Sequence, residues 1–283
     1  MSGADRVEAL LDDAACRLEA AGMSNAAGEA RMLLAHQLGC SPSRFRIWPE
    51  ALVGDDDAET FRTLVAARAG GRPLAYITEE CEFWSLPLKV TPATLIPRPD
   101  TETLVEAAIA CPLPEVARVL DVGTGSGAVA LALAQERPDW YVTASETSGE
   151  ALAVAETNAS TLGLKVTFVE GDLLAPFHET DAWDLIVSNP PYVAADDPHL
   201  CCGDLRYEPQ SALAAGADGL DVIRPLVAGA LQRLAPGGWL LLEHGYDQAL
   251  AIAALLKEAG FGSCFMQHDL AGNPRVSGGR RED

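Results

Sequence analysis

Lysine is almost absent from this chain of 283 residues, and negative charge is in large excess. Only three lysines occur, and 41 Asp and Glu residues outnumber 20 Lys and Arg residues, so the formal net charge is −21. Proteins that bind nucleic acids need Lys and Arg to neutralise the phosphates. We therefore expect no direct binding of nucleic acid. Residues 1–78 carry a net charge of −3 and the remainder −18, which makes the N-terminal part less repulsive to an acidic partner.

The seven cysteines and five histidines form no recognisable site. The number of cysteines is odd and no Cys-x-x-Cys pair occurs, so neither a disulfide framework nor a zinc site is indicated. The histidines include no His-Glu-x-x-His or similar pairing, and we expect no metal. We interpret the cysteines as reduced thiols, mostly buried, of a cytoplasmic protein.

Long apolar runs are also missing. No stretch of about 18 apolar residues occurs, so we expect no membrane span. The acidic N-terminus does not resemble a signal peptide. Hydrophobic residues nevertheless make up 48% of the chain, which is enough for one large core or two modest ones.

The most informative stretch is residues 118–134, which read Arg-Val-Leu-Asp-Val-Gly-Thr-Gly-Ser-Gly-Ala-Val-Ala-Leu-Ala-Leu-Ala. Its apolar, β-branched start predicts a buried parallel strand, and its end predicts a helix that stops before Pro138. Gly123, Gly125 and Gly127 let the backbone between them adopt positive φ and approach a ligand closely. The spacing differs from that of dinucleotide-binding and phosphate-binding loops, and it resembles the first motif of S-adenosylmethionine-dependent methyltransferases. A tight turn that binds no ligand is the alternative.

The first 71 residues have the apolar spacing of short helices. The helical period runs through three regions, which are closed by Gly22, by Gly39 and by Gly70-Gly71. No strand signal is present, so we predict a small helical bundle. The bundle either has a structural role, covering the rest of the protein, or binds a macromolecular partner.

Residues 72–100 are rich in proline, and we expect them to form an extended linker. Partial alternation over residues 83–90 predicts a β-hairpin. The stiff segment around residues 95–102 can fold over a bound ligand. Thr101 is expected to cap a helix that runs to Ile109.

Strands and helices alternate over the rest of the chain. Seven strands are predicted at residues 118–122, 141–145, 166–169, 185–188, 239–243, 261–267 and 275–277. Helices are predicted at residues 128–137, 150–162, 221–234 and 248–259. This order predicts an α/β fold with a parallel, doubly wound sheet and right-handed crossovers.

Polar residues follow the ends of the predicted strands, where ligands bind in such a sheet. Glu146 ends the second strand, roughly 20 residues past the glycine loop, where a carboxylate can hold a ribose diol through two hydrogen bonds. Asp172 can accept from an adenine amino group while Leu173 covers the ring, although Asp is also a common turn residue. We predict as cofactor-binding residues Asp121, Gly123, Thr124, Gly125, Ser126, Gly127, Glu146, Asp172, Leu173 and Asn189.

The strongest chemical motif is Asn189-Pro190-Pro191-Tyr192. The prolines stiffen the turn, so that the Asn189 side-chain oxygen and the Pro190 carbonyl can point at one spot as two acceptors. Tyr192 offers a flat face for stacking. Such a site fits a planar –NH2 group and can align its nitrogen with a methyl donor. We predict that Asn189, Pro190 and Tyr192 are catalytic and that all four residues bind substrate. A proline turn without chemistry is the alternative.

Further short motifs are spread along the chain. They are Arg72-Pro-Leu-Ala-Tyr-Ile77, Glu82-Phe-Trp84, Leu95-Ile-Pro-Arg-Pro-Asp-Thr-Glu102, Leu120-Asp-Val-Gly-Thr-Gly-Ser-Gly127, Ser188-Asn-Pro-Pro-Tyr-Val193, Glu208-Pro209, Gly216-Ala-Asp-Gly-Leu-Asp221, Pro236-Gly-Gly238 and Glu243-His-Gly245. In combination they resemble the peptide chain release factor glutamine methyltransferase family, and the resemblance covers essentially the whole chain.

This resemblance implies a fold and an activity. The implied fold is a seven-stranded class I S-adenosylmethionine-dependent methyltransferase domain at residues 101–283, after a linker at 72–100 and a helical substrate-docking domain at 1–71. The implied reaction moves a methyl group from S-adenosylmethionine to the glutamine amide nitrogen in the Gly-Gly-Gln motif of class I release factors. S-adenosylhomocysteine is the product, and neither a metal nor a membrane takes part.

Two positions depart from the family pattern, and several alternatives stay open. Glu79 stands where the family usually has Gly, and Glu146 where it usually has Asp. A sister family that methylates a ribosomal protein shares the Asn-Pro-Pro-Tyr motif, but its linker usually reads Pro-Arg-Ser-Pro, whereas residues 97–102 read Pro-Arg-Pro-Asp-Thr-Glu. A DNA adenine-N6 methyltransferase would need a basic cleft. A scaffold that only binds S-adenosylmethionine would not need the Asn-Pro-Pro-Tyr motif.

Overall fold

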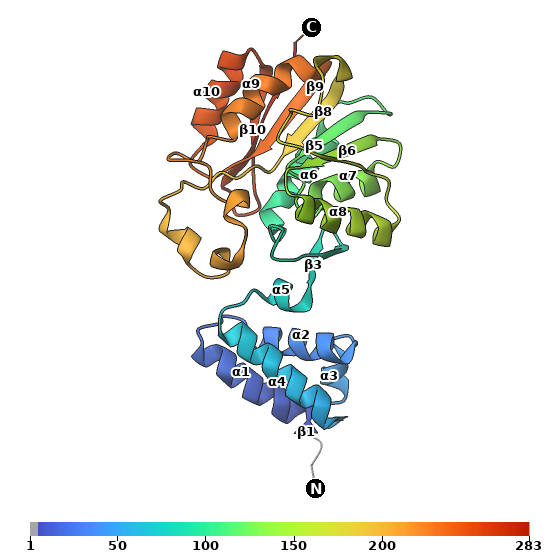
Figure 1. Cartoon of the computed structure of the whole chain (residues 1–283), viewed down its shortest axis with the longest axis vertical. Helices are drawn as coiled ribbons and strands as arrows, with labels where there is room; N and C mark the ends of the chain where they lie inside the picture. The colour runs from blue at the N-terminus through green and yellow to red at the C-terminus, as the bar shows by residue number, and fades with distance from the viewer. Residues whose placement is uncertain (1–4, 283) are drawn as a thin grey trace. The chain divides into compact units, whose positions relative to one another are not determined.

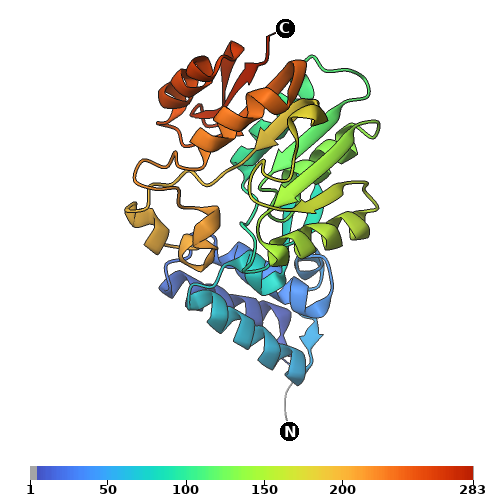
Figure 2. The same ribbon diagram turned by 45° about the horizontal axis from the view of Figure 1, so that its top comes forward.

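The computed structural model describes residues 5–282, which form two compact units. The first unit extends to Glu79 and the second begins at Glu80. The short helix Leu74–Thr78 belongs to the first unit, so the helical region continues past residue 71. Figures 1 and 2 show the helices of the first unit in blue to teal and the sheet of the second in green to red.

The first unit is a bundle of helices around its own core. Its helices are α1 (Val7–Ala20), α2 (Ala26–Leu38), α3 (Arg44–Ile47), α4 (Asp55–Ala69) and α5 (Leu74–Thr78). Buried side chains from these helices, among them Leu18, Leu33 and Phe61, gather in one cluster. Within it the Arg68 guanidinium pairs with Glu29 across 2.6 Å and ties α4 to α2.

A very short antiparallel pair corrects the expectation that this unit has no strand. β1 (Asp5–Arg6) pairs with β2 (Leu52–Val53). In β2 one residue is exposed and the other buried. Two residues are too few to display an alternating pattern, so the sequence carries no signal for this pair.

The second unit begins with a β-hairpin, as the alternation predicts. β3 (Glu80–Phe83) pairs antiparallel with β4 (Leu86–Lys89). The connecting residues Trp84 and Ser85 both have positive φ, 52° and 59°, as a type I′ turn requires. The Trp84 backbone N–H donates to the Glu102 side chain at 3.0 Å, which holds this turn against the following helix.

A seven-stranded sheet forms the centre of the second unit and confirms the predicted α/β fold. Its strands are β5 (Arg118–Val122), β6 (Tyr141–Glu146), β7 (Thr167–Glu170), β8 (Trp183–Ser188), β9 (Leu234–Glu243), β10 (Gly262–His268) and β11 (Pro274–Arg280). They lie in the order β10-β11-β9-β8-β5-β6-β7. The five strands from β9 to β7 are parallel, so their carboxyl ends share one edge.

Helices cover both faces of this sheet (Figure 1). One face packs against α6 (Glu102–Ala110), α7 (Ala128–Glu136) and α8 (Gly149–Leu162), and the other against α9 (Ile223–Arg233) and α10 (Ala249–Ala259). Leu185 and Val187 of β8 point into the first core, whereas Ile186 points into the second. Burial on both faces explains why β8 and the second half of β9 read as continuous apolar runs.

Short 3-10 helices lie in the connections. They are η1 (Pro99–Thr101), η2 (Glu179–Asp181), η3 (Pro198–Cys201), η4 (Leu205–Tyr207) and η5 (Gln210–Ala212).

The last two strands depart from the all-parallel expectation. β11 is antiparallel to both β9 and β10. A short turn joins β10 to β11, and within it the Asp269 carboxylate accepts from the backbone N–H groups of Ala271 at 3.0 Å and Asn273 at 2.8 Å. A connection this short can only reverse the chain, because a parallel neighbour needs a long crossover.

The cysteines correct a second expectation. All seven are free, three are half-buried and four are exposed, so they are not mostly buried. Within residues 5–282, no helix combines the length and the apolar character that crossing a membrane requires. The same part of the chain contains no group of three His, Cys, Asp or Glu side chains placed to hold a metal ion.

Candidate active site

A cavity of about 420 Å³ lies at the carboxyl ends of the parallel strands. Its volume is in the range of small-molecule sites. Thirteen residues are predicted for the site, all in the described part of the chain, and ten of them line this cavity. Gly127, Pro190 and Tyr192 lie outside its lining. The linker supplies one wall, through Pro92, Ala93, Thr94, Leu95 and Pro97.

The glycine loop between β5 and α7 presents open backbone to the cavity. Gly123 and Gly125 have φ values of 74° and 57°, and a Cβ added at either would meet no protein atom within 4 Å. Gly127 differs, because a Cβ there would come within 3.0 Å of Leu131 and 3.2 Å of Ala155. The first two glycines therefore leave room for a ligand, and the third allows close packing of α7.

Asp121 is the next-to-last residue of β5 and is only 1% exposed. Its Oδ2 accepts from the Thr124 hydroxyl at 2.6 Å and from the Ala130 backbone N–H at 3.2 Å. Burial raises the pKa of Asp121 to about 7, against the opposing effect of these two hydrogen bonds. A positively charged ligand group beside Asp121 would stabilise the carboxylate form that burial disfavours.

Glu146, at the end of β6, is engaged with the loop backbone. Its Oε1 accepts from the N–H groups of Thr147 at 2.8 Å and Ser148 at 3.0 Å, and its Oε2 from that of Gly125 at 2.9 Å. A carboxylate offers about four acceptor positions, so one position on Oε2 remains. Glu146 must release a backbone N–H before both of its oxygens can accept from a diol. The sequence does not indicate that these backbone hydrogen bonds exist.

Asp172 and Leu173 form another part of the cavity wall. The Asp172 backbone carbonyl closes its turn by accepting from Ala175 at 2.9 Å. No hydrogen bond to the Asp172 carboxylate occurs within residues 5–282, so the side chain is left for a ligand. Leu173 has a φ of 47°. A left-handed residue that is not glycine costs on the order of 1 kcal/mol and is typical of ligand sites.

The cavity wall is acidic. Four carboxylates line it, those of Asp121, Glu146, Glu150 and Asp172. Among the described residues that line it there is no Lys or Arg. Because phosphate groups are bound by cations and N–H donors, this wall favours a positively charged ligand over a phosphate-bearing one.

Asn189 follows β8 and lies at the rim of the cavity with its amide oriented. Its Nδ2 donates to the Thr101 hydroxyl oxygen at 3.2 Å, and its Oδ1 has no partner in the described part of the chain. The Thr101 hydroxyl thus binds Asn189 and does not cap α6. This corrects the expectation that Thr101 is a helix cap. The Tyr192 carbonyl accepts from the Gln248 side chain at 2.9 Å, which fixes the far end of the turn.

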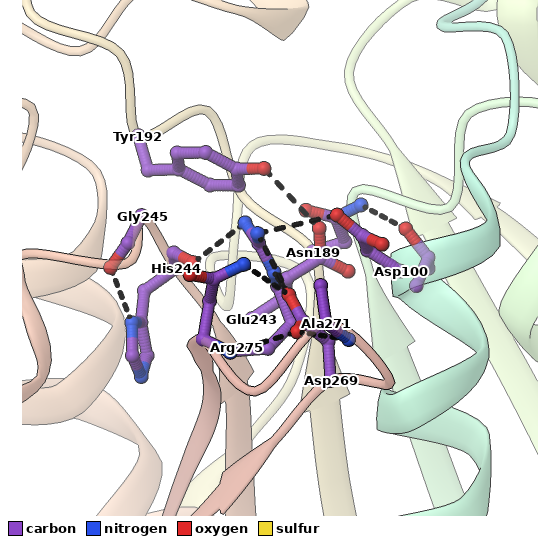
Figure 3. Close-up of polar contacts among 11 residues, drawn as sticks. Asp100, Asn189, Tyr192, Glu243, His244, Gly245, Asp269, Ala271 and Arg275 are labelled. Carbon is purple, nitrogen blue, oxygen red and sulfur yellow. Dashed lines mark hydrogen bonds and ion pairs between the residues drawn. The ribbon is translucent and has the colours of Figure 1, made fainter.

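A buried carboxylate that the sequence analysis does not single out lies beneath this turn (Figure 3). Glu243 ends β9, is 1% exposed, and accepts from the Tyr192 hydroxyl at 3.3 Å. Burial raises the pKa of Glu243 to about 7, although Thr101, Arg275 and Tyr192 favour the charged form. A signal existed, because Glu243 directly follows an apolar strand at the sheet edge that carries Asp121 and Glu146.

His244, the next residue, is not available as a base. It is fully buried, with Nδ1 2.8 Å from the Gly245 carbonyl and Nε2 2.8 Å from the Ser277 hydroxyl. A carbonyl can only accept, so Nδ1 carries the proton and Nε2 accepts from Ser277. Burial lowers the pKa of His244, which keeps the ring neutral. The role of His244 is therefore structural.

One side chain joins the hairpin to the glycine loop. Asn158 of α8 is 2% exposed. Its Oδ1 accepts from the Lys89 backbone N–H at 2.7 Å, and its Nδ2 donates to the Lys89 carbonyl at 3.0 Å and the Ser126 carbonyl at 2.9 Å. The linker and the glycine loop are thus parts of one hydrogen-bonded frame.

Two family models match the chain, described as the PrmC N-terminal domain, over residues 9–78, and the Methyltransferase small domain, over residues 101–202. A release factor glutamine methyltransferase of Vibrio cholerae is 43% identical over 275 residues, which cover 97% of this chain and 96% of that protein. The chain belongs to the release factor glutamine methyltransferase family. This confirms the resemblance carried by the motifs.

Another member of the family, from Pseudomonas aeruginosa, is 49% identical over 252 residues, which cover 89% of this chain and 91% of that protein. Among solved structures, the T. thermophilus 16S rRNA N2 G1207 methyltransferase in complex with AdoMet and guanosine superposes with a TM-score of 0.55 at 21% identity. The match covers 72% of this chain and 50% of that one, and it shows the fold alone.

Proposed function

We propose that this protein transfers a methyl group from S-adenosylmethionine to the glutamine side-chain nitrogen in the Gly-Gly-Gln motif of class I peptide chain release factors. The observation that carries the proposal is the orientation of Asn189 at the rim of an acidic cavity. Its amide nitrogen is bound to Thr101 and its amide oxygen is left for a substrate. Relatives named for this activity, at 43% and 49% identity, support the release factor as the substrate.

The cavity fits S-adenosylmethionine, which carries a positive sulfonium and a positive amino group. Its acidic wall complements these charges, and the open backbone at Gly123 and Gly125 leaves space for the ligand. We assign the ribose to Glu146, through the acceptor position that remains on its Oε2, and the adenine amino group to Asp172. The Methyltransferase small domain model, which matches residues 101–202, supports this class of cofactor. We propose no metal.

The residues around Asn189 supply orientation. When bound, the cofactor supplies the methyl group, whose bond to sulfur breaks as its bond to the amide nitrogen forms. An amide nitrogen is a poor nucleophile because its lone pair is delocalised. Asn189 Oδ1 and the Pro190 carbonyl would each accept one N–H, which holds the nitrogen in line and favours its pyramidal form. Tyr192 would support the flat amide, and the nitrogen can lose its proton after transfer.

We assign substrate docking to the helical part of the chain. In this view residues 1–71 bind the body of the release factor, residues 72–100 connect, and residues 101–283 carry the chemistry. Exposed apolar side chains on the first unit support this, because Ile47 is 62% and Trp48 50% exposed. The Arg44 guanidinium lies 5.8 Å from the Trp48 ring centroid. Release factors act in the cytoplasm, which is the location we propose, and we expect no direct nucleic acid binding.

The test is incubation with labelled S-adenosylmethionine and three separate substrates: a release factor, a ribosomal protein and DNA. We expect label on the release factor alone, and none on a control factor whose Gly-Gly-Gln glutamine is changed to alanine. Label on the ribosomal protein would favour the sister activity, and label on DNA an adenine methyltransferase. Cofactor binding without transfer to any substrate would favour a scaffold.

A further inference from the structure

The side chain of Asn158 is buried behind the cavity and does not line it. Asn158 belongs to α8 and is 2% exposed. A polar group buried this deeply needs hydrogen-bond partners. All the partners of Asn158 are backbone groups of other segments. Its Oδ1 accepts from the Lys89 N–H at 2.7 Å, and its Nδ2 donates to the carbonyls of Lys89 at 3.0 Å and Ser126 at 2.9 Å.

On one side Asn158 fixes a peptide group of the glycine loop. Ser126 stands between Gly125 and Gly127, whose φ values are 57° and 86°. Glycine on both sides gives this part of the backbone unusual freedom to rotate. The hydrogen bond from Asn158 to the Ser126 carbonyl removes that freedom. One turn earlier on the same face of α8, Ala155 packs so closely that a Cβ added at Gly127 would come within 3.2 Å of it.

On the other side Asn158 holds the start of the linker wall. Lys89 is the last residue of β4, and its N–H and carbonyl both bond to this one amide, as they would to a neighbouring strand. Three positions later, Pro92 begins the part of the linker that lines the cavity. Lys89 itself does not line the cavity. The amide therefore fixes the linker wall from behind, outside the space that a ligand fills.

We infer that Asn158 is a positioning residue for the cofactor, which sets the spacing between the glycine loop and the linker wall across the cavity. This inference rests on the proposed function, which assigns the cavity to S-adenosylmethionine. A ligand that touches both walls binds more tightly when both are already in place, because less ordering has to accompany binding. Asn158 acts on the ligand only through these two backbone segments.

The transfer step should depend on Asn158 much less than cofactor binding does. The linker has a second anchor at Ile96, whose N–H donates to Glu208 at 3.0 Å. Thr101, which accepts from Asn189 at 3.2 Å, comes after this anchor. A displacement at the start of the linker should therefore stop before it reaches the amide that orients the substrate. A loss of folded protein would act differently, because it would lower the amount of active enzyme.

The experiment compares Asn158→Ala and Asn158→Asp with wild type in the full-length protein. Alanine removes the whole amide, whereas aspartate keeps its shape and the acceptor for the Lys89 N–H but loses both donors. Val154→Ala is the matched control. It removes a buried side chain of the same helix that does not line the cavity, so it costs packing and no hydrogen bond.

Steady-state methylation of a saturating Gly-Gly-Gln peptide measures kcat and the KM for S-adenosylmethionine, and calorimetry measures Kd. In both Asn158 variants KM and Kd should rise by about tenfold, the effect of leaving a buried group without its hydrogen bond. The value of kcat should stay within about threefold of wild type, since the groups that act in the transition state are retained. Val154→Ala should keep the wild-type KM.

Hydrogen exchange in wild type tests the same frame without a variant. The Lys89 N–H donates to a buried group outside the cavity lining, so a ligand can protect it only through the frame. The Gly127 N–H, which donates to the Thr124 carbonyl at 2.9 Å, reports on the glycine loop. At a cofactor concentration ten times Kd, exchange at both positions should slow by about tenfold, because the ligand binds only the closed frame.

Three results would overturn the inference. One is an Asn158→Ala enzyme with the wild-type KM and Kd for S-adenosylmethionine. Another is a lower kcat at unchanged KM, as expected when part of the enzyme is unfolded. The third is protection by the cofactor at Gly127 without protection at Lys89. Failure of the proposed function is a separate result, in which wild type itself would bind no S-adenosylmethionine or methylate no glutamine substrate.

Discussion

Arg98 of the linker is paired with Glu208, a carboxylate whose side chain is fully buried. The second oxygen of Glu208 accepts from the Ile96 backbone N–H at 3.0 Å. Pro97 lies between the two linker residues and lines the cavity, as does Pro209, which follows Glu208. One carboxylate therefore holds two walls of the cavity together.

Removing the cation should loosen this wall. Burial raises the pKa of Glu208, and Arg98 opposes that shift. In Arg98→Ala, Glu208 stays buried without its partner, whereas Glu208→Gln keeps a neutral acceptor for Ile96. We expect Arg98→Ala to weaken cofactor binding by roughly 1–2 kcal/mol, a value reduced because Arg98 is partly exposed, and Glu208→Gln to weaken it less. Calorimetry measures both, with the exposed Arg224→Ala as control, and equal affinities throughout would contradict the clamp.

The fold was readable because its signals are local and repeated. A central strand such as β8 contains an apolar run, residues 185–187, that is buried on both faces, and β5, β6, β8 and β9 each lead to an α-helix. The edge that carries Asp121, Glu146 and Asn189 follows from the parallel order alone. The antiparallel end of the sheet was also readable, because the strands predicted at residues 261–267 and 275–277 leave too few residues between them for a parallel crossover, and the parallel expectation did not use this length.

The support behind the site was not readable for a different reason. Thr101 and Asn189 are 88 positions apart, and Tyr192 and Glu243 are 51 apart. Nothing in the spacing of either pair indicates a contact, since only the tertiary fold brings them together. The hydrogen bonds of Glu146 could not be predicted either, because its carboxylate accepts from the loop backbone and is not free to accept from a ribose with both oxygens.

Glu146→Ala should weaken the binding of S-adenosylmethionine by roughly 1.5–3 kcal/mol, the range for hydrogen bonds to a charged group. The variant loses the acceptor for a ribose hydroxyl and also the anchor of the Gly125 N–H. Calorimetry is the measurement. Glu156→Ala is the matched control, because it removes an exposed acid of α8. This variant should bind S-adenosylmethionine with the wild-type affinity. An unchanged affinity in Glu146→Ala would remove this residue from the site.

Asp121 should make cofactor binding depend on pH. Because burial raises its pKa to about 7, the free protein holds a proton there at pH 6. A cationic ligand beside it favours the carboxylate, so binding releases that proton and affinity should rise from pH 6 to pH 8, then level off. Calorimetry at pH 6.5 in buffers of different ionisation enthalpy counts the released protons. Asp121→Asn should show a smaller release, and equal release by both proteins would exclude this role.

The helical unit should matter only for whole release factors. Arg44 and Arg46 are exposed on α3 beside Trp48. Reversing both charges in R44E/R46E should raise KM for an intact release factor by about tenfold, or roughly 1.4 kcal/mol, and leave a Gly-Gly-Gln peptide unaffected. Arg17→Glu, on α1, is the control for a reversed charge elsewhere on the unit. Equal losses on the protein and the peptide would contradict docking through this surface.

Asn189→Ala should separate chemistry from cofactor binding. The sheet should persist, since Asn189 follows the end of β8, and the cofactor should bind nearly as before, since Asp121, Glu146 and Asp172 remain. What is lost is one of two acceptors that orient the amide, and that interaction is strongest as the nitrogen becomes pyramidal. By analogy with the loss of one preorganised hydrogen-bonding group, methyl transfer should slow by roughly 10²–10³-fold.

Asn189→Asp is the sharper variant, because it keeps an acceptor of the same reach but cannot donate to Thr101 as Asn189 does. It also places a second carboxylate close to Glu243, so part of the activity should survive while the orientation of the turn is disturbed. Single-turnover methyl transfer at saturating cofactor, together with cofactor affinity, decides between these effects. Methyl transfer by Asn189→Ala at near the wild-type rate would mean that Asn189 does not orient the substrate amide, since the rest of the cavity is left intact.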